Sequence, residues 1–205
     1  MAVGKKSSHK NAARSRHLIK QAFAELLNEK DISKITVTDI VDRANISRGT
    51  FYAHYLDVYD LYAAIQSNIV ETVGEALDDI GISNIIVNPT EAISLGLSFL
   101  NQNKSYYKLF LNSSHGESLI KRIISLAEEK FEHEIRSIFP DENESAEYVY
   151  HMYYTLGGFR NILIHWFNDQ NTIPTSICAD YLTKFYLANQ SNELIAAIKA
   201  KKNKE

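Results

Sequence analysis

Cysteine, proline and glycine are all scarce in this chain of 205 residues, which limits the disulfides and the helix breaks that it can contain. Cys178 is the only cysteine, so no internal disulfide can form and nothing indicates an oxidising compartment. With three prolines, eight glycines and few alternating β-branched runs, little in the chain interrupts helices. The composition therefore predicts an all-α protein.

Long apolar runs are also missing. No run is long enough to cross a bilayer, and the basic start leads straight into polar sequence without the apolar core of a signal peptide. We therefore expect a cytoplasmic protein with no membrane partner. An apolar content of 45% still provides a core of ordinary size, in one large or two small domains.

Charge is unevenly divided along the chain. The net charge of −3, taken alone, argues against a nucleic-acid binder. Through Leu56, however, ten Lys or Arg stand against five Asp or Glu, whereas the remainder has twelve against twenty. This asymmetry predicts that the N-terminal part meets phosphate and that the C-terminal part does not.

The stretch from Thr36 to Leu61 contains two helix starts joined by a tight connection, followed by a third helix start. Thr36 with Asp39 three residues later predicts a capped amphipathic helix of about two turns. Asn45 tolerates the left-handed backbone that ends a helix, and Ser47 can cap the next one. Two short helices joined in this way suggest a helix-turn-helix.

The polar residues of the second helix have chemistry that suits a DNA groove. Gly49 removes bulk beside Arg48, so backbone can approach a phosphate or a base edge. Arg48 can bind guanine bidentately, and Thr50 can offer its hydroxyl or methyl group to a base. Tyr52 and His54 suit phosphate oxygens, which fix position without reading sequence. The helix alone leaves open an ordinary amphipathic helix with a solvated polar face.

The wider run TVTDIVDRANISRGTFYAHY resembles the DNA-binding signature of the TetR family of bacterial transcriptional regulators, and the resemblance covers about residues 14 to 65. It implies DNA-facing roles for Thr38, Ser47, Arg48, Gly49, Thr50, Tyr52 and His54, with Ser47 as the cap of the recognition helix. One position departs from the family pattern, because Val58 stands where a phosphate-binding lysine is usual. A missing phosphate contact should weaken operator binding and its salt dependence, unless the N-terminal arm compensates.

The chain order predicts four segments. Residues 1–13 are expected to form a basic flexible arm whose lysines contact the DNA backbone or are solvated. Residues 14–60 would form the helix-turn-helix DNA-binding domain, a head of three helices. By the resemblance, residues 61–198 form a larger helical ligand-binding and dimerisation domain. Residues 199–205 are charged and are expected to form a tail that frays. After a long helix from Asp57 to Gly81 and a break up to Pro89, helices are expected at about 90–102, 104–112, 117–139, 144–169 and 174–189.

The last two of these helices carry apolar residues on more than one side, so they need more than one packing partner. Gly157 and Gly158 lie in the middle of the first and allow close helix approach. We interpret the pair as half of a four-helix homodimer interface, since a palindromic operator is met by a two-fold dimer. A purely intramolecular core is the alternative.

A small-molecule effector pocket is a further expectation that the resemblance brings. The candidates to line it are aromatic residues of the C-terminal helices. They are Phe99, Tyr107, Phe110, Tyr153, Tyr154 and Trp166. Ordinary core packing remains the alternative for each.

Catalytic and metal-binding motifs are not found in the sequence. Glu129 and His133 are spaced i, i+4 but have no third ligand at a telling spacing, which favours a surface pair over a metal site. There is no phosphate-binding glycine loop, and Cys178 has no motif around it. We therefore expect no enzyme, no metal and no cofactor.

Together these patterns predict a ligand-responsive DNA-binding transcriptional regulator. The resemblance implies a repressor that binds a palindromic operator as a dimer and is released by a small molecule. The alternative is a coregulator of the same fold that acts through a protein partner with weak or no DNA binding. Val58 and the modest charge of the head favour that alternative.

Overall fold

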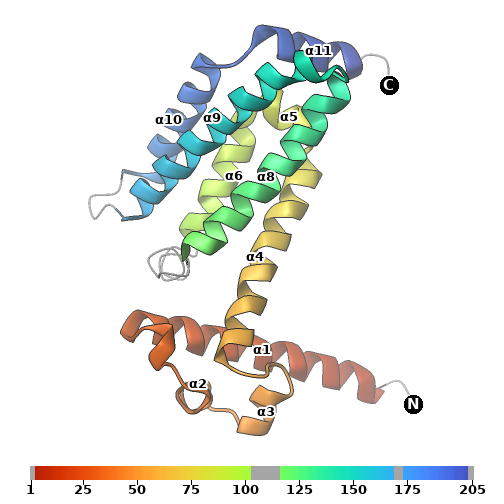
Figure 1. The fold of residues 1–205 in the computed structure, drawn as a ribbon. Coiled ribbons are helices and arrows are strands. Elements are labelled where there is room, and N and C mark those ends of the chain that lie inside the picture. The colour runs from red at the N-terminus through yellow and green to blue at the C-terminus, as the bar shows by residue number, and fades with distance from the viewer. Residues whose placement is uncertain (1–2, 103–115, 169–172, 203–205) are drawn as a thin grey trace. The chain divides into compact units, whose positions relative to one another are not determined.

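The structure is a computed structural model that describes residues 3–102, 116–168 and 173–202. Every regular element within these ranges is a helix, which confirms the all-α prediction. The chain divides into two compact units, Met1–Ile69 and Val70–Glu205 (Figure 1). None of the helices in the described ranges is long and apolar enough to cross a membrane.

The first unit contains α1 (Val3–Glu29), the short 3-10 helix η1 (Ile32–Lys34), α2 (Val37–Ala44), α3 (Arg48–Tyr52) and the first turns of α4 (Val58–Ile80). Its core is apolar and fully buried at Ile19, Phe23, Ile40, Phe51 and Leu61. The rings of Phe23 and Tyr62 pack edge to face, with ring centroids 6.3 Å apart. The first turns of α4 therefore belong to this core, and the unit ends later in α4 than the predicted boundary after residue 60.

Residues 3–13 are helical, so the predicted flexible arm is wrong for this segment. Between Gly4 and Arg14 the chain has neither glycine nor proline. A helix that is already nucleated extends at little cost through such sequence, because each added residue gains a backbone hydrogen bond. The buried positions Ile19 and Phe23 anchor α1 and supply that nucleus.

The second unit contains the rest of α4 together with α5 (Ile82–Val87), α6 (Pro89–Gln102), α8 (Gly116–Ile138), α9 (Glu142–Asn168), α10 (Thr175–Ala188) and α11 (Asn192–Lys202). Helix α6 packs mainly against α10. Helix α8 packs mainly against α9, and the two lie side by side in Figure 1. Residues of α5, α8, α9 and α11 meet in a buried cluster that includes Ile86, Ile135, Met152 and Ile198.

Two predictions for this unit need correction. The expected break from Gly81 to Pro89 contains α5, because Gly81 ends α4 at φ 82° and the buried pair Ile85 and Ile86 then anchors one short helix. Residues 199–202 are not a frayed tail but the last turn of α11, which Leu194 and Ile198 hold in the core. The helix predicted at 104–112 lies outside the described residues. The other predicted helices are confirmed with small shifts at their ends.

Candidate nucleic-acid interface

Helix α2 begins with the predicted capping box. The Thr36 hydroxyl accepts from the Asp39 amide at 3.2 Å, and the Asp39 carboxylate accepts from the Thr36 amide at 2.7 Å. The Lys30 ammonium lies 2.8 Å from the same carboxylate. Lys30 and then the two donors of Thr36 lower the pKa of Asp39 to about 2. The helix ends as predicted at Asn45, which has a left-handed φ of 51°.

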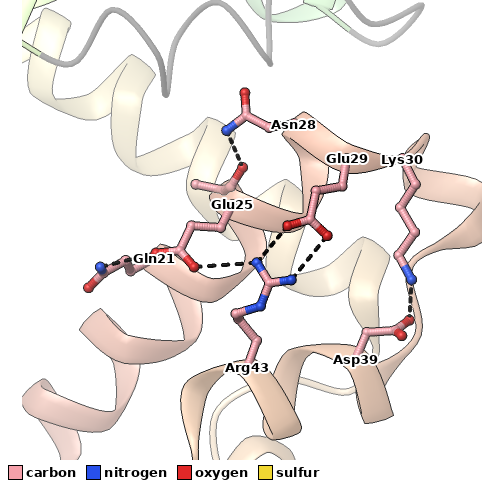
Figure 2. A network of polar contacts seen from close by, with 8 residues as sticks. Gln21, Glu25, Asn28, Glu29, Lys30, Asp39 and Arg43 are labelled. Carbon is pink, nitrogen blue, oxygen red and sulfur yellow. Dashed lines mark hydrogen bonds and ion pairs between the residues drawn. The ribbon is translucent and has the colours of Figure 1, made fainter.

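Arg43 ties α2 to α1 (Figure 2). Its guanidinium makes a forked contact with Glu29, at 2.9 and 3.0 Å, and lies 3.5 Å from Glu25. The hydrogen bond to Glu29 raises the pKa of Arg43 and lowers the pKa of Glu29. These groups are exposed, so the contacts orient α2 more than they stabilise it.

Helix α3 is five residues long and is capped by Ser47, whose hydroxyl accepts from the Thr50 amide at 3.1 Å. Phe51 and Tyr55 are buried, as their i, i+4 spacing predicts. Tyr52 is 55% exposed, and Arg48 and Gly49 are exposed as well. The sequence of α3 thus separates a core side from a side that faces away from the core.

Two residues predicted to face DNA are in contact with each other. The Arg48 guanidinium donates to the Thr38 hydroxyl at 2.7 Å, which places the arginine against the first turn of α2. A Cβ added at Gly49 would meet only the Ser47 hydroxyl, at 3.7 Å. Packing within the head therefore does not require glycine at this position, and its backbone is open to an outside partner.

His54 is placed differently from the other candidates. Its Nε2 lies 2.7 Å from the Ser15 hydroxyl on α1, and its side chain is half-buried. Burial lowers the pKa of His54, and the positive charge of Arg16 lowers it further. The Nε2 edge of the imidazole therefore holds the segment just after α3 to α1 instead of pointing to solvent. Sequence reasoning missed Ser15, since no local pattern links positions so far apart.

The first turn of α4 differs from a phosphate site. The Val58 side chain is buried in the core of the head. The Asp60 amide donates to the Asp57 carboxylate at 2.8 Å, and the Leu56 amide donates to the Asp60 carboxylate at 2.9 Å. Because two carboxylates already occupy these amides, the start of α4 offers phosphate little attraction. Leu56, just before it, is 80% exposed.

Of the residues predicted to line an effector pocket, the structure describes Phe99, Tyr153, Tyr154 and Trp166, and it places them in different grooves or in the core. Phe99 lines a groove of about 410 Å³ between α4 and α6. Tyr153 and Tyr154 line an open groove of about 530 Å³ on the surface of α9 and α10. Trp166 is buried, with its indole N–H donating to the Ile173 carbonyl at 3.0 Å. Tyr107 and Phe110 lie outside the described residues.

A small pocket of about 60 Å³ among the helices of the second unit was not predicted. Side chains from α5, α6, α8, α9, α10 and α11 line it, among them His151, Thr155, Phe159 and Tyr186. Burial raises the pKa of Tyr186 to about 12. Because six helices contribute, no spacing within one segment of the sequence could have indicated this cavity.

Helices α9 and α10 also carry an exposed apolar face, which we call the α9–α10 face. Its large members are Tyr150, Tyr153, Tyr154, Ile177, Tyr181 and Phe185. A Cβ added at Gly157 or Gly158 would meet no atom within 4 Å. These glycines therefore leave space at the surface instead of serving a close approach inside the chain.

The helical head, with a capped α2, a tight left-handed turn and a short α3, has the geometry of a helix-turn-helix DNA-binding protein. The family described as bacterial regulatory proteins, tetR family, matches residues 19–65. A second description, transcriptional regulator C-terminal region, matches residues 88–187. Together the two matches cover well over half of the chain, which belongs to the TetR family of bacterial transcriptional regulators.

Individual relatives share low sequence identity with this chain. The chain is 27% identical over 108 residues to the HTH-type transcriptional regulator YxbF of Bacillus subtilis (strain 168), a match that covers 51% of this chain and only 28% of that protein. A TetR transcriptional regulator from Streptococcus agalactiae 2603V has a similar fold, with a TM-score of 0.59, 21% identity and coverage of 89% of this chain and 98% of that one. A TerR/AcrR family regulator from Aquifex aeolicus VF5 gives a TM-score of 0.66 at 20% identity, covering 85% and 98%.

Proposed function

We propose that this protein is a repressor that binds a palindromic operator as a homodimer and releases it when a small molecule binds the second unit. The observation that carries the DNA-binding part is the pairing of Arg48 with Thr38 on the exposed side of the helix-turn-helix. An arginine held by one donor–acceptor contact keeps the rest of its planar fork for a guanine. Tyr52, exposed four residues along, is suited to a phosphate oxygen.

The first test is a gel-shift assay with a DNA fragment that covers the region upstream of the protein's own gene, at low and moderate salt. We expect a specific shift that weakens as salt rises. Arg48→Ala should relax base preference by roughly 1 to 3 kcal/mol, whereas Tyr52→Ala should weaken binding to all sequences alike. Unchanged DNA affinity in both variants would rule out α3 as the reading helix.

Dimerisation is supported by the α9–α10 face. Several large apolar side chains there are exposed in the single chain, and contiguous exposed apolar surface commonly marks an interaction site. Gly157 and Gly158 leave room for a second helix to approach. A two-fold contact through this face would give the four-helix arrangement expected for an operator-binding dimer.

Release by a ligand requires a link between the two units. Helix α4 begins among buried residues of the first unit and ends in the second, so a displacement at its far end would be transmitted along one continuous helix. A ligand that favours a dimer state with unsuitable head spacing would then release DNA.

A coregulator that acts through a protein partner is the second candidate. It is favoured by Val58, which is buried, and by Asp57 and Asp60, which place negative charge at the start of α4. Both features reduce phosphate contacts at the head. Absence of any gel shift even at low salt would favour this candidate over operator binding.

A further inference from the structure

The hydrogen bonds of Ser15 determine which nitrogen of His54 carries a proton. The Ser15 hydroxyl oxygen lies 3.0 Å from the Asn11 carbonyl oxygen and 3.1 Å from the Ala12 carbonyl oxygen, both in the preceding turn of α1. A hydroxyl has one proton, and a carbonyl oxygen can only accept. The Ser15 proton therefore points to these carbonyls, because oxygen atoms this close would repel each other with no proton between them.

His54 must then be the donor in its own contact with Ser15. Its Nε2 lies 2.7 Å from the Ser15 oxygen, whose remaining lone pairs accept. The neutral imidazole carries a single N–H, so a proton on Nε2 leaves a bare lone pair on Nδ1. The Ser15 contact thus fixes the tautomer of His54 as well as the orientation of its ring.

The Nδ1 atom of His54 is open to an outside partner. It makes no hydrogen bond with any residue that the structure describes, and it is not among the buried side-chain atoms without a partner in the described ranges. A phosphate oxygen of DNA accepts hydrogen bonds and cannot donate them, so the lone pair of a neutral Nδ1 would repel it. Only the imidazolium, which has an N–H at both nitrogens, can bind phosphate from this position.

The surroundings of the ring favour a neutral His54 in the free protein. Burial lowers the pKa of His54 below its ordinary value of 6.5, and the positive charge of Arg16 on α1 lowers it further. On α4, the carboxylates of Asp57 and Asp60 accept from amides at the start of that helix, and the charge of Asp60 acts on the neighbouring Tyr55. A phosphate contact at neutral pH therefore requires His54 to take up a proton.

We propose that Ser15 is a positioning residue of the DNA interface, which holds His54 so that the ring binds a backbone phosphate through Nδ1–H only as the imidazolium. Each head then takes up one proton when it binds DNA. The phosphate contact rests on the proposed function, whereas the tautomer of His54 does not depend on DNA.

The sign of the pH dependence follows from this proton uptake. A phosphate stabilises the charged ring, so the pKa of His54 is higher in the complex than in the free protein. DNA binding is strongest below the pKa of the free protein and weakens as pH rises toward the pKa of the complex.

The tautomer is tested first, in the full-length protein without DNA. Long-range proton–nitrogen NMR spectra at pH 8, with His54→Gln to assign the signals, distinguish a protonated Nε2 from a protonated Nδ1. We expect the proton of His54 on Nε2. A proton on Nδ1 would overturn the proposal whatever the DNA measurements give.

The second test is a fluorescence-anisotropy titration of the DNA fragment upstream of the protein's own gene, between pH 6 and pH 8 at constant ionic strength. The association constant of the wild type should fall at least about tenfold over this range, since one proton per head can change it by up to about tenfold per pH unit. His54→Gln keeps an N–H for Ser15 but cannot titrate, and its affinity should hardly change with pH. His17→Ala, an exposed histidine on α1, is the matched control and should keep the wild-type slope.

Ser15→Ala separates positioning of the ring from support of the fold. Without the Ser15 oxygen, the neutral ring is free to carry its proton on Nδ1 and to donate to phosphate without titrating. The pH dependence should therefore flatten, and at pH 8 the variant should bind DNA at least as tightly as the wild type. Ser15→Thr keeps the hydroxyl and should restore the wild-type profile.

Three binding results would overturn the proposal: a wild-type affinity that does not change with pH, a slope that persists in His54→Gln, or an equal loss of affinity at every pH in Ser15→Ala. If Ser15→Ala fails to fold, as judged by circular dichroism, the NMR spectra and His54→Gln decide the matter. A wild type that binds no DNA at any of these pH values would contradict the proposed function and with it the phosphate contact, while the tautomer of His54 would stand.

Discussion

At the scale of single residues, the contact between Arg48 and Thr38 leads to a prediction about how the protein recognises DNA bases. If Thr38 positions the arginine, Thr38→Ala should weaken the preference for the operator over an operator whose contacted guanine is replaced by another base. The ratio of the two affinities should fall about fivefold, the effect of roughly 1 kcal/mol for one hydrogen bond. Thr38→Ser keeps the hydroxyl and should behave like the wild type.

Gel-shift titrations in a double-mutant cycle separate this role from a direct contact of Thr38 with DNA. In an Arg48→Ala background the Thr38→Ala change should have almost no further effect on discrimination, because the two side chains act as one unit. Full additivity of the two changes would show that Thr38 acts independently of Arg48.

The contacts of Asp39 lead to a second prediction, which concerns the folding free energy. Asp39→Asn removes the carboxylate that accepts from Thr36 and Lys30, and should cost about 1 kcal/mol of folding free energy at neutral pH, as for other lost caps. The folded pKa is about 2, below the ordinary value of 3.8, so this carboxylate contributes fully above pH 3.8 and its contribution is lost as pH falls toward 2.

Thermal unfolding followed by circular dichroism at pH 7 and pH 3 checks this sign. The difference between wild type and Asp39→Asn should be larger at pH 7 than at pH 3. Asp42→Asn, on the same helix and exposed, should change little at either pH. An equal deficit at both pH values would mean that the carboxylate charge is not the stabilising feature.

At the scale of secondary-structure elements, the α9–α10 face makes a prediction about assembly. Tyr154 is 70% exposed and Phe185 lies on the neighbouring helix of the same groove. Changing either to Lys should place an unpaired charge in the dimer contact and raise the dimer dissociation constant about 30-fold or more, as for other interface hot spots.

Sedimentation at several protein concentrations measures the effect. Leu95→Lys provides the control, since Leu95 is also exposed and apolar but lies on α6, outside the α9–α10 face. A wild type that sediments as a monomer, or lysine variants that remain dimers, would remove this face as the dimer interface.

Elements with local signals were predicted well. Helices α2 and α3 have caps at Thr36 and Ser47, and a left-handed Asn45 between them, all within a few residues of each other. Their ends are therefore encoded locally. Helix α5 and the N-terminal turns of α1 were missed, because the former is held by burial of Ile85 and Ile86 against distant helices and the latter by extension of an anchored helix.

The candidate sites also divide into those with a local sequence signal and those built from distant segments. Most DNA-facing candidates belong to one continuous stretch, so a sequence pattern and a family resemblance could indicate them together. The contact of His54 with Ser15 and the cavity around His151 are both built from segments distant in sequence. The resemblance and the aromatic residues of the C-terminal helices indicated Tyr154, which is 70% exposed at the surface.

At the scale of the whole molecule, a dimer that reads a palindrome must present two α3 helices to major grooves on one side of the DNA. Inserting about five base pairs between the half-sites turns the second half-site by about half a helical turn, to the opposite side. A wild-type dimer should then lose the contribution of one head, and its affinity should approach that for a single half-site.

Gel shifts on the two operators, with and without the insertion, measure this loss. Tyr154→Lys is the matched comparison, because a chain that no longer dimerises has no second head to displace and should bind both operators equally. If the wild type is also indifferent to the insertion, the heads act independently. Dimerisation through the α9–α10 face would then not determine operator spacing, and a ligand could not release DNA by changing the separation of the heads.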